Sequence, residues 1–313
     1  MIYLVKNFPK GMVKMKNMWY NKRTLLFSGG VGMILADCHT HTQFSVDSEA
    51  DIVKCVEKAI ELGLSAYAIT DHCECNRWFS KDHYPDETTY QYFDFGRDFE
   101  NSLTAVTAMK QKYSGKLNLI CGVEMGQATH DLEIAEKIVS DERLDFVLGS
   151  MHQLPKTEDF CFIDYSQYSL DGIYDLAERY FLELYKLCKW GKFDVLAHLT
   201  YFMRYLKCKA NTDIDISRFD DIIADSFRLL AQNGKGLEIN TSGIRQGFGD
   251  TFPDLKYVKL FYEMGGEIIS IGSDSHTVED IGANVAEGIE TARAAGFTRI
   301  AYYINRKPNF IEL

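Results

Sequence analysis

The sequence predicts an α/β fold whose parallel strands close into a barrel. Short apolar runs alternate along the chain with amphipathic stretches that have apolar residues at helical spacing. This strand–helix–strand rhythm, repeated about seven times, indicates a parallel sheet with crossover helices. The runs are apolar throughout, as expected of strands that are buried on both faces. Seven or eight such units in roughly 280 residues favour a closed barrel related to the (β/α)₈ type. An open doubly wound sheet is the alternative.

Eight apolar runs are the predicted strands, and they cover residues 34–39, 66–72, 117–125, 145–152, 194–200, 236–242, 267–276 and 299–305. Three stretches between them, 49–63, 171–191 and 218–234, have the spacing of amphipathic helices and end in glycine. Segment 73–116 interrupts the rhythm. We expect it to form a large loop over one mouth of the barrel and then to lead into a helix.

The beginning of the chain differs from the rest. Residues 1–32 are basic and rich in Met and Asn, and they lack the apolar core and small-residue cleavage site of a signal peptide. We therefore expect residues 1–32 to be an N-terminal extension outside the fold, with Met33 as a candidate for the true start. Residues 33–313 are then expected to form a single domain.

Composition narrows the range of partners. The chain has 313 residues, of which 46% are hydrophobic, so it can bury a large core. Its net charge of −11, without a dense run of Lys and Arg, argues against nucleic acids and anionic membranes. No apolar stretch reaches the ~18 residues that a membrane span needs. The eight cysteines are irregularly spaced, which is typical of reduced thiols in a cytoplasmic protein.

Side chains with metal-ligand chemistry gather where the predicted strands end. Six of the eight histidines lie there, joined by Glu124 and Asp274; the six are His39, His41, His72, His152, His198 and His276. Parallel strands in a barrel open onto one face at their carboxyl ends, where barrel active sites are built. Imidazoles and carboxylates together are ligands for divalent transition-metal ions. The sequence therefore predicts a metal site at this face.

The end of the first predicted strand carries the most specific signal for a metal site. Residues 37–48 read DCHTHTQFSVDS, and residues i and i+2 of a strand lie on the same side. His39 and His41 are therefore expected to point together toward the barrel mouth. The two other histidines, His83 and His130, lie away from strand ends and are expected to be surface or loop residues.

Seven ordered motifs resemble those of the PHP (polymerase and histidinol phosphatase) superfamily, and within it the histidinol-phosphatase branch. They are DCHTHTQFSVDS, AITDHCE, GVEMG, GSMH, AHLTY, LEINTSG and GSDSH. The resemblance runs from about Ala36 to the end of the chain. It implies a distorted (β/α)₇ TIM-like barrel that holds three divalent metal ions, which are zinc, iron or manganese.

The resemblance also implies which residues hold the metals. The first metal would be held by His39, His41, Glu124 and Asp274, the second by Glu124 as a bridge with His152 and His198, and the third by Asp47, His72 and His276. Some relatives have His at the position of Asp47, which leaves open a weaker or differently selective third site. Glu124, Asp274 and His152 are the predicted catalytic residues. Asp71 is either a carboxylate that orients an imidazole from outside or a structural cap.

The activity implied by the resemblance is hydrolysis of L-histidinol phosphate to L-histidinol and phosphate, a step of histidine biosynthesis. A water that bridges two metal ions would lose a proton near neutral pH and attack phosphorus as hydroxide. Arg204 and Arg245, expected on loops after the fifth and sixth strands, are the predicted phosphate-binding residues. Lys207 is an alternative candidate for the same role. An acidic, aromatic lid from residues 73–100 is expected to receive the substrate ammonium, with Glu74 as one contact.

Other functions remain as alternatives. A broader small-molecule phosphatase would keep every metal ligand and differ in the lid. A PHP-type nucleic-acid phosphoesterase is disfavoured by the acidic charge. An amidohydrolase-type barrel also opens with His-x-His, but it typically uses a bridging Lys and fewer metals. A non-catalytic metal-binding protein is disfavoured because all nine expected ligands are present. The sequence leaves the oligomeric state open.

Overall fold

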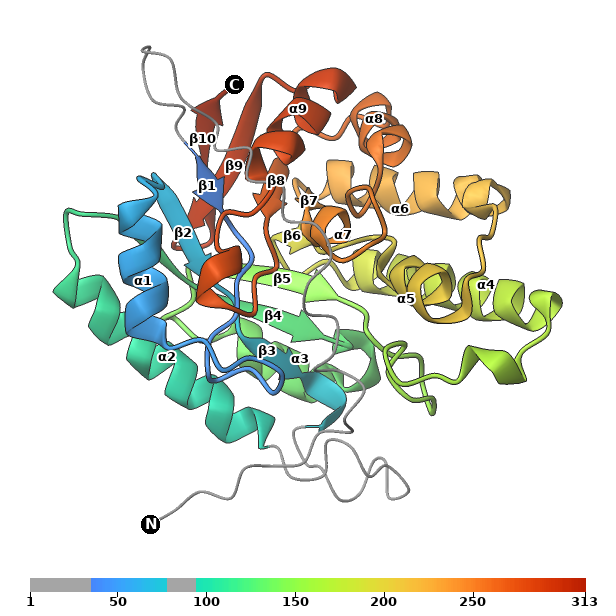
Figure 1. Ribbon diagram of the computed structural model, residues 1–313, viewed down its shortest axis with the longest axis horizontal. Coiled ribbons are helices and arrows are strands. Elements are labelled where there is room, and N and C mark those ends of the chain that lie inside the picture. Colours follow the sequence, from blue (N-terminus) through green and yellow to red (C-terminus); the bar gives the residue numbers. More distant parts are fainter. Residues whose placement is uncertain (1–34, 78–93) are drawn as a thin grey trace. The chain divides into compact units, whose positions relative to one another are not determined.

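The computed structural model describes residues 35–77 and 94–313 (Figure 1). The compact unit to which they belong is Ile34–Leu313. The extension predicted for residues 1–32, His83 and most of the predicted lid lie outside the described residues, so those predictions stay predictions.

Seven parallel strands form the central sheet, in the order β1-β2-β4-β5-β6-β7-β8. Their bounds are Ala36–Asp37 for β1, Ala66–Ile69 for β2, Asn118–Gly126 for β4, Phe146–Ser150 for β5, Val195–Leu196 for β6, Gly236–Asn240 for β7 and Ile269–Gly272 for β8. The predicted run 66–72 is split, because a separate short strand, β3 (His72–Glu74), pairs with the end of β4. The other predicted strands of the sheet are confirmed, β4 with its bounds shifted by one residue and the rest with shorter bounds.

The sheet nearly closes on itself between β8 and β1. The Cys38 N–H donates to the Ile271 carbonyl over 2.9 Å, and the Asp274 N–H donates to the His39 carbonyl over 2.7 Å. A parallel bridge also joins Thr40 to Ser275. The barrel prediction is therefore confirmed, and the open doubly wound sheet was the wrong alternative.

The eighth predicted strand does not join the parallel sheet. It forms β9 (Arg299–Ile304), which pairs antiparallel with β10 (Lys307–Glu312). Asn305 and Arg306 both have positive φ, 51° and 61°, as the tight turn of a two-residue hairpin requires. The chain thus reverses directly after β9 instead of crossing over, and the barrel has seven parallel strands.

Helices follow the strands around the barrel (Figure 1). They are α1 (Ile52–Glu61), α2 (Phe95–Lys112), α3 (Leu132–Val139), α4 (Leu170–Trp190), α5 (Tyr201–Ala210), α6 (Asp220–Gln232), α7 (Ser242–Arg245), α8 (Leu255–Glu263) and α9 (Val285–Ala295). The three helices expected from the apolar spacing correspond to α1, α4 and α6, and α2 is the helix expected within 73–116. Side-chain caps mark several starts: Asp51 accepts from the Lys54 N–H, and Ser169 from the Gly172 N–H. Among the described helices, none has the length and apolarity to cross a membrane.

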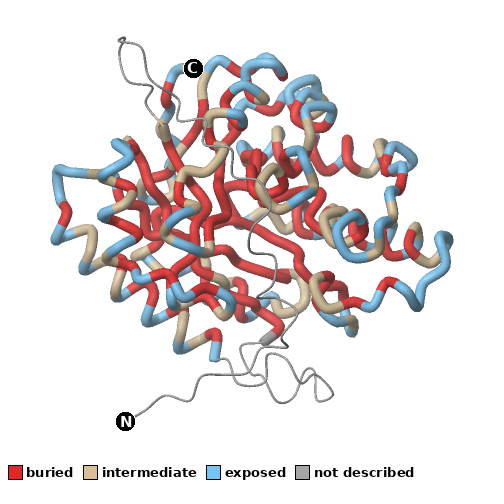
Figure 2. Tube along the Cα trace, in the orientation of Figure 1, coloured by how far each residue is buried: buried red, intermediate tan, exposed pale blue. Residues whose placement is uncertain are grey.

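The strands of the parallel sheet are buried and the outward faces of the helices are exposed (Figure 2). Large side chains such as Tyr67, Phe146 and Phe227 are fully buried in the core. All eight cysteines are free, as the irregular spacing predicted. A close-packed interior holds the strand ends in place, so side chains that project from those ends are carried on a rigid support.

Candidate metal centre

Glu124, near the end of β4, lies between two groups of imidazoles. Its Oε1 is 2.7 Å from Nε2 of His198 and 2.8 Å from Nε2 of His152. Its Oε2 faces the other way, 3.2 Å from Nε2 of His39 and 3.5 Å from Nε2 of His41. The two oxygens of one buried carboxylate therefore face different groups of imidazoles, as the bridging role predicted for Glu124 requires.

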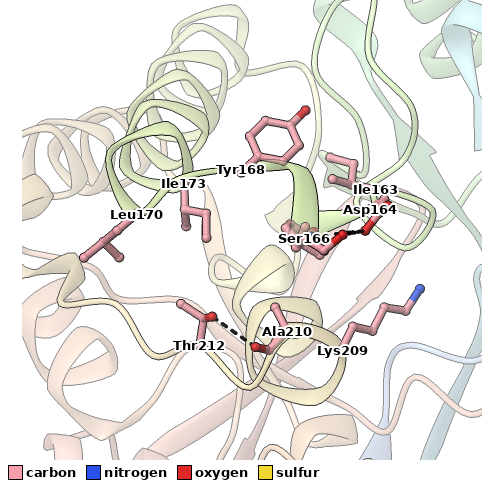
Figure 3. A pocket seen from close by; sticks show the side chains of 10 residues that line it. Ile163, Asp164, Ser166, Tyr168, Leu170, Ile173, Lys209, Ala210 and Thr212 are labelled. Carbon is pink, nitrogen blue, oxygen red and sulfur yellow. Dashed lines mark hydrogen bonds between the residues drawn. The ribbon is translucent and has the colours of Figure 1, made fainter.

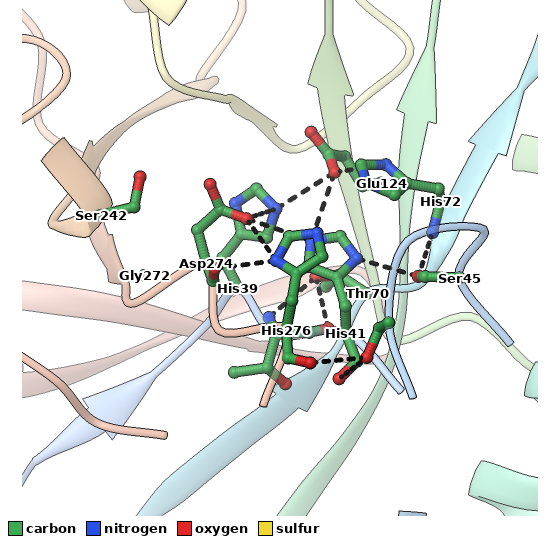
Figure 4. A network of polar contacts seen from close by, with 12 residues as sticks. His39, His41, Ser45, Thr70, His72, Glu124, Ser242, Gly272, Asp274 and His276 are labelled. Carbon is green, nitrogen blue, oxygen red and sulfur yellow. Dashed lines mark hydrogen bonds and ion pairs between the residues drawn. The ribbon is translucent and has the colours of Figure 1, made fainter. Parts of the chain in front are cut away.

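Asp274 completes the first predicted ligand set. Its Oδ1 is 3.3 Å from Nε2 of His41 and 3.7 Å from Nε2 of His39. These three residues offer ligand atoms that all lie within 4.8 Å of one another. Asp274 follows β8 and the two histidines follow β1. Closure of the barrel between these strands therefore brings residues that are far apart in sequence together at this point (Figure 4).

The third predicted set also converges. Asp47 lies 3.3 Å from Nε2 of His276 and 3.6 Å from Nε2 of His72, measured from its carboxylate oxygens. The His41 ring stacks on both histidines, with ring centroids 4.1 Å and 4.3 Å away. Nδ1 of His72 also lies 2.9 Å from Oε2 of Glu124, so the third set borders the shared carboxylate. The Asp47 side chain is half exposed, so this set stands at the solvent side of the centre. The nine predicted ligands thus form one continuous cluster.

Orphaned buried atoms show that the cluster suits cations. Among the described residues, His39 Nε2, His41 Nε2 and Glu124 Oε2 are buried and have no hydrogen-bond partner. Buried polar atoms without a partner are rare and costly. Nitrogen and oxygen acceptors that face one common space would all be satisfied by a divalent ion. The residues therefore fit the metal ions that the sequence predicted.

Charge also favours cation binding. Burial alone would raise the pKa of Glu124, but His152, His72 and His39 hold that pKa well below its usual range. Burial, with the neighbouring His276 and His72, lowers the pKa of His41 well below its usual range. Glu124 is therefore an anion and His41 a neutral imidazole, the forms in which both side chains bind metals.

Asp71 supports the centre from behind. Its carboxylate accepts from Ser45 Oγ over 2.9 Å and from Ser102 Oγ over 2.6 Å. Ser45 Oγ lies in turn 3.0 Å from Nδ1 of His41. Asp71 also accepts from the Thr42 N–H over 2.6 Å. Both interpretations of Asp71 therefore hold: it caps the loop after β1, and it acts on the His41 imidazole through a serine.

Glu74 occupies a place that the sequence did not predict. It was expected to contact the substrate ammonium, but its side chain is buried and its Oε1 lies 2.9 Å from Nδ1 of His152. Another carboxylate, Glu238 on β7, contacts His39 in the same way. A charged residue inside an otherwise apolar strand was the available signal for Glu238.

The two predicted phosphate-binding arginines lie on helices, so their expected placement on loops was wrong. The chain turns into α5 and α7 within a few residues of β6 and β7. Arg204, in α5, donates to Tyr205 Oη over 2.8 Å and approaches Ser242 Oγ at 3.5 Å. Lys207 is exposed and donates to the Phe248 carbonyl.

Arg245, in α7, points at the backbone that carries a metal ligand. Its guanidinium donates to the carbonyl oxygens of Ser273 and Asp274 over 2.5 Å and 2.7 Å. Its Nε lies 3.4 Å from a carboxylate oxygen of Asp280. The predicted contact with phosphate therefore stays a prediction, beside a structural contact that the sequence did not indicate.

A surface pocket elsewhere holds none of the predicted site residues. It lies between the 3₁₀ turn η3 (Tyr165–Gln167), the beginning of α4 and the end of α5 (Figure 3). Asp164, Tyr168 and Lys209 are among the residues that line it. The candidate site is therefore identified by its cluster of metal-ligand residues and not by this pocket.

His130, in the 3₁₀ turn η2 (Ala128–His130), stands outside the nine-residue cluster.

Comparison with known families agrees with this geometry. The profile of the PHP domain matches residues 37–242. The chain belongs to the PHP domain family. This PHP protein is 26% identical over 276 residues to a probable histidinol-phosphatase from Thermotoga maritima, which covers 85% of this chain and 95% of the relative. It is also 26% identical over 276 residues to a histidinol-phosphatase from Lactococcus lactis, with 87% and 95% covered.

A solved structure shares the fold. It is histidinol phosphate phosphatase from Lactococcus lactis, complexed with zinc, L-histidinol and phosphate. The TM-score is 0.71 at 24% sequence identity, over 88% of this chain and 99% of that one. The likeness confirms the distorted seven-stranded barrel for the PHP protein described here.

Proposed function

We propose that this PHP protein is a metal-dependent phosphomonoesterase that hydrolyses L-histidinol phosphate to L-histidinol and phosphate, as a cytoplasmic enzyme of histidine biosynthesis. The observation that carries metal-dependent hydrolysis is the Glu124 carboxylate, whose two oxygens are shared between two groups of histidines. The choice of substrate is supported by two relatives, one named a probable histidinol-phosphatase and one a histidinol-phosphatase. The match covers 95% of the length of each relative.

The proposed centre holds three divalent ions in three ligand sets, of which the first two share Glu124. The sets are His39, His41, Glu124 and Asp274; Glu124, His152 and His198; and Asp47, His72 and His276. Zinc in the Lactococcus lactis structure supports zinc here, and iron and manganese suit the same mixture of ligands. Bound ions of this kind neutralise a phosphate monoester and lower the pKa of coordinated water.

The protein's part is to hold the ligand atoms in place before substrate binds. The Nδ1 atoms of His152 and His41 face Glu74 Oε1 and Ser45 Oγ, which leaves Nε2 of each imidazole for the centre. Fixing the second nitrogen in this way sets which nitrogen carries the proton. Preorganised ligands need little rearrangement during the reaction.

Cationic side chains complete the proposed phosphate site. Arg204 Nε is buried and has no hydrogen-bond partner among the described residues, so one donor of this guanidinium is free for a ligand. Arg245 lies against the backbone of Asp274, beside the first ligand set. Arginine is suited to this role because its planar fork can donate two bonds to one phosphate.

The test is phosphate release in the steady state by metal-reconstituted protein. L-Histidinol phosphate is compared with sugar phosphates, nucleotides and a DNA oligomer, and Glu124→Gln serves as the inactive variant. A preference for L-histidinol phosphate of about a hundredfold in kcat/KM, roughly 2.7 kcal/mol, establishes the substrate. Similar rates on all small esters indicate a general phosphatase. Activity on DNA alone indicates a nucleic-acid phosphoesterase, and no release from any substrate contradicts the proposal.

A further inference from the structure

Glu238 is a fully buried carboxylate in the middle of β7, and it lies behind the metal ligands. Its Oε1 is 2.7 Å from Nδ1 of His39, and the side chains of both residues are at most 1% exposed. The opposite nitrogen of the same imidazole, Nε2, faces Glu124 and Asp274. A carboxylate at Nδ1 keeps the proton on that nitrogen and leaves Nε2 as the free acceptor.

The second oxygen of Glu238 contacts a different part of the centre. Its Oε2 accepts the backbone N–H of His198 over 2.8 Å. His198 follows the two-residue strand β6, which has few ladder hydrogen bonds of its own. One carboxylate thus fixes the side chain of a ligand in the first set and the backbone of a ligand in the second.

The surrounding residues are shaped for this contact. Gly272, on the neighbouring strand β8, has no side chain; a Cβ there would lie 2.3 Å from His39 Cβ and 2.4 Å from Glu238 Oε1. Asn240 lies two residues beyond Glu238 on the same side of β7. Its Nδ2 is 3.3 Å from Glu238 Oε2 and 3.3 Å from Asp274 Oδ2, which extends the contact to another ligand.

We propose that Glu238 is a positioning residue that couples the first and second metal sites from behind. It sets the tautomer of His39, and it anchors the backbone that presents His198. The inference rests on the ligand sets of the proposed function. The inference goes beyond those ligand sets, because Glu238 binds no ion itself and yet controls the affinity of two ions.

Glu74 provides a matched comparison. It contacts Nδ1 of His152, a ligand of the second set, over 2.9 Å. It also approaches Nδ1 of His72, of the third set, at the longer distance of 3.8 Å. Loss of the Glu74 carboxylate is therefore expected to leave the first site intact, whereas loss of the Glu238 carboxylate weakens the first and the second.

The experiment compares zinc binding by Glu238→Gln, Glu74→Gln and a control, Glu183→Gln. Glu183 lies in α4 and pairs with Lys186, away from the ligands. Equilibrium dialysis with metal analysis gives the affinity of each ion. Removing a partner of this kind weakens metal affinity about 10–100-fold. We expect that loss for two ions in Glu238→Gln, no loss at the first site in Glu74→Gln, and wild-type binding in the control.

Proton NMR of ¹⁵N-histidine-labelled protein reads the tautomer directly. Wild-type protein should show an exchangeable proton on His39 Nδ1, assigned by its absence in His39→Gln, and Glu238→Gln should lose that signal or shift it. Unchanged zinc affinities together with an unchanged signal overturn the proposal. If Glu238→Gln does not fold, the spectrum of the zinc-loaded wild type decides: a proton on Nδ1 supports the proposal, and a proton on Nε2 alone overturns it. Wild-type protein that binds no zinc contradicts the proposed function itself.

Discussion

Arg245 Nη2 donates a hydrogen bond to the backbone carbonyl oxygen of Asp274 over 2.7 Å. Asp274 has a φ of 53°, in the left-handed region that residues other than glycine seldom adopt. Such a conformation persists where the surroundings enforce it, and it is frequent at functional sites. The Asp274 N–H is also held, by the His39 carbonyl over 2.7 Å. Arg245 therefore helps to hold a strained residue whose side chain faces the first metal set.

Arg245→Ala is expected to release metal from the first site and to lower kcat/KM about 10–100-fold. This is the usual effect of losing a hydrogen-bond partner of a metal-binding residue. Arg204→Ala, measured beside it, should raise KM and leave the metal content unchanged, because Arg204 makes no described contact with the Asp274 backbone. Metal analysis after dialysis separates the two variants. Full metal content in Arg245→Ala with only a raised KM would show that this arginine serves phosphate alone.

Glu124→Gln is expected to lower kcat/KM by more than about 100-fold, since it alters a shared ligand and not merely an outer partner. It should also weaken two ions at once, because the two carboxylate oxygens face different groups of histidines. Metal content and phosphate release are measured on the same preparation, with Glu183→Gln as control. Retention of all metal in Glu124→Gln argues against a bridging carboxylate.

Zinc affinity is expected to increase with pH. Burial opposes protonation of His152, but Glu124 and Glu74 raise the pKa of its imidazole to about 10 in the metal-free protein. At neutral pH this imidazole is charged and must release its proton to bind a metal, which makes binding weaker as pH falls. Each proton released changes the affinity about tenfold per pH unit. Zinc calorimetry in buffers of different ionisation enthalpy counts these protons, and a count of zero contradicts the expectation.

Gly272→Ala is expected to destabilise the fold by about 1–3 kcal/mol, because the new Cβ overlaps two buried side chains that cannot move apart freely. Gly172→Ala is the control. That position lies in the first turn of α4, where an added Cβ meets only ordinary contacts, and alanine favours helix there. Urea unfolding measures both. Equal stability of Gly272→Ala and the wild type would mean that the space around Glu238 is not tight.

Much of the fold could be predicted because its signals are local. Apolar strands, helical spacing and the polar residue at each strand end are readable within a few positions of one another. The two-residue period of a strand led us to expect His39 and His41 on one face. Both histidines in fact follow β1, which ends at Asp37, and their Nε2 atoms still face the same oxygen of Glu124. The parallel sheet then brings these ends to one mouth, so the ligand cluster followed from the predicted topology.

Contacts between distant residues could not be read in this way. Glu238 meets His39 across 199 positions of sequence, and the meeting depends on the register of β7, β8 and β1. The direction of the Arg245 side chain depends on the short helix that follows β7, which was expected to be a loop. The reversal after β9 was missed because the turn at Asn305 and Arg306 lacks glycine, the usual residue at positive φ.

The most direct test of the account is anomalous diffraction from a crystal of the zinc-loaded protein. We predict three peaks within bonding distance of the nine ligands, with the Glu124 carboxylate between two of them and the third beside Asp47, His72 and His276. A map with no peak at Glu124, or with Glu124 bound to a single ion, would contradict the central claim that this carboxylate joins two metal sites.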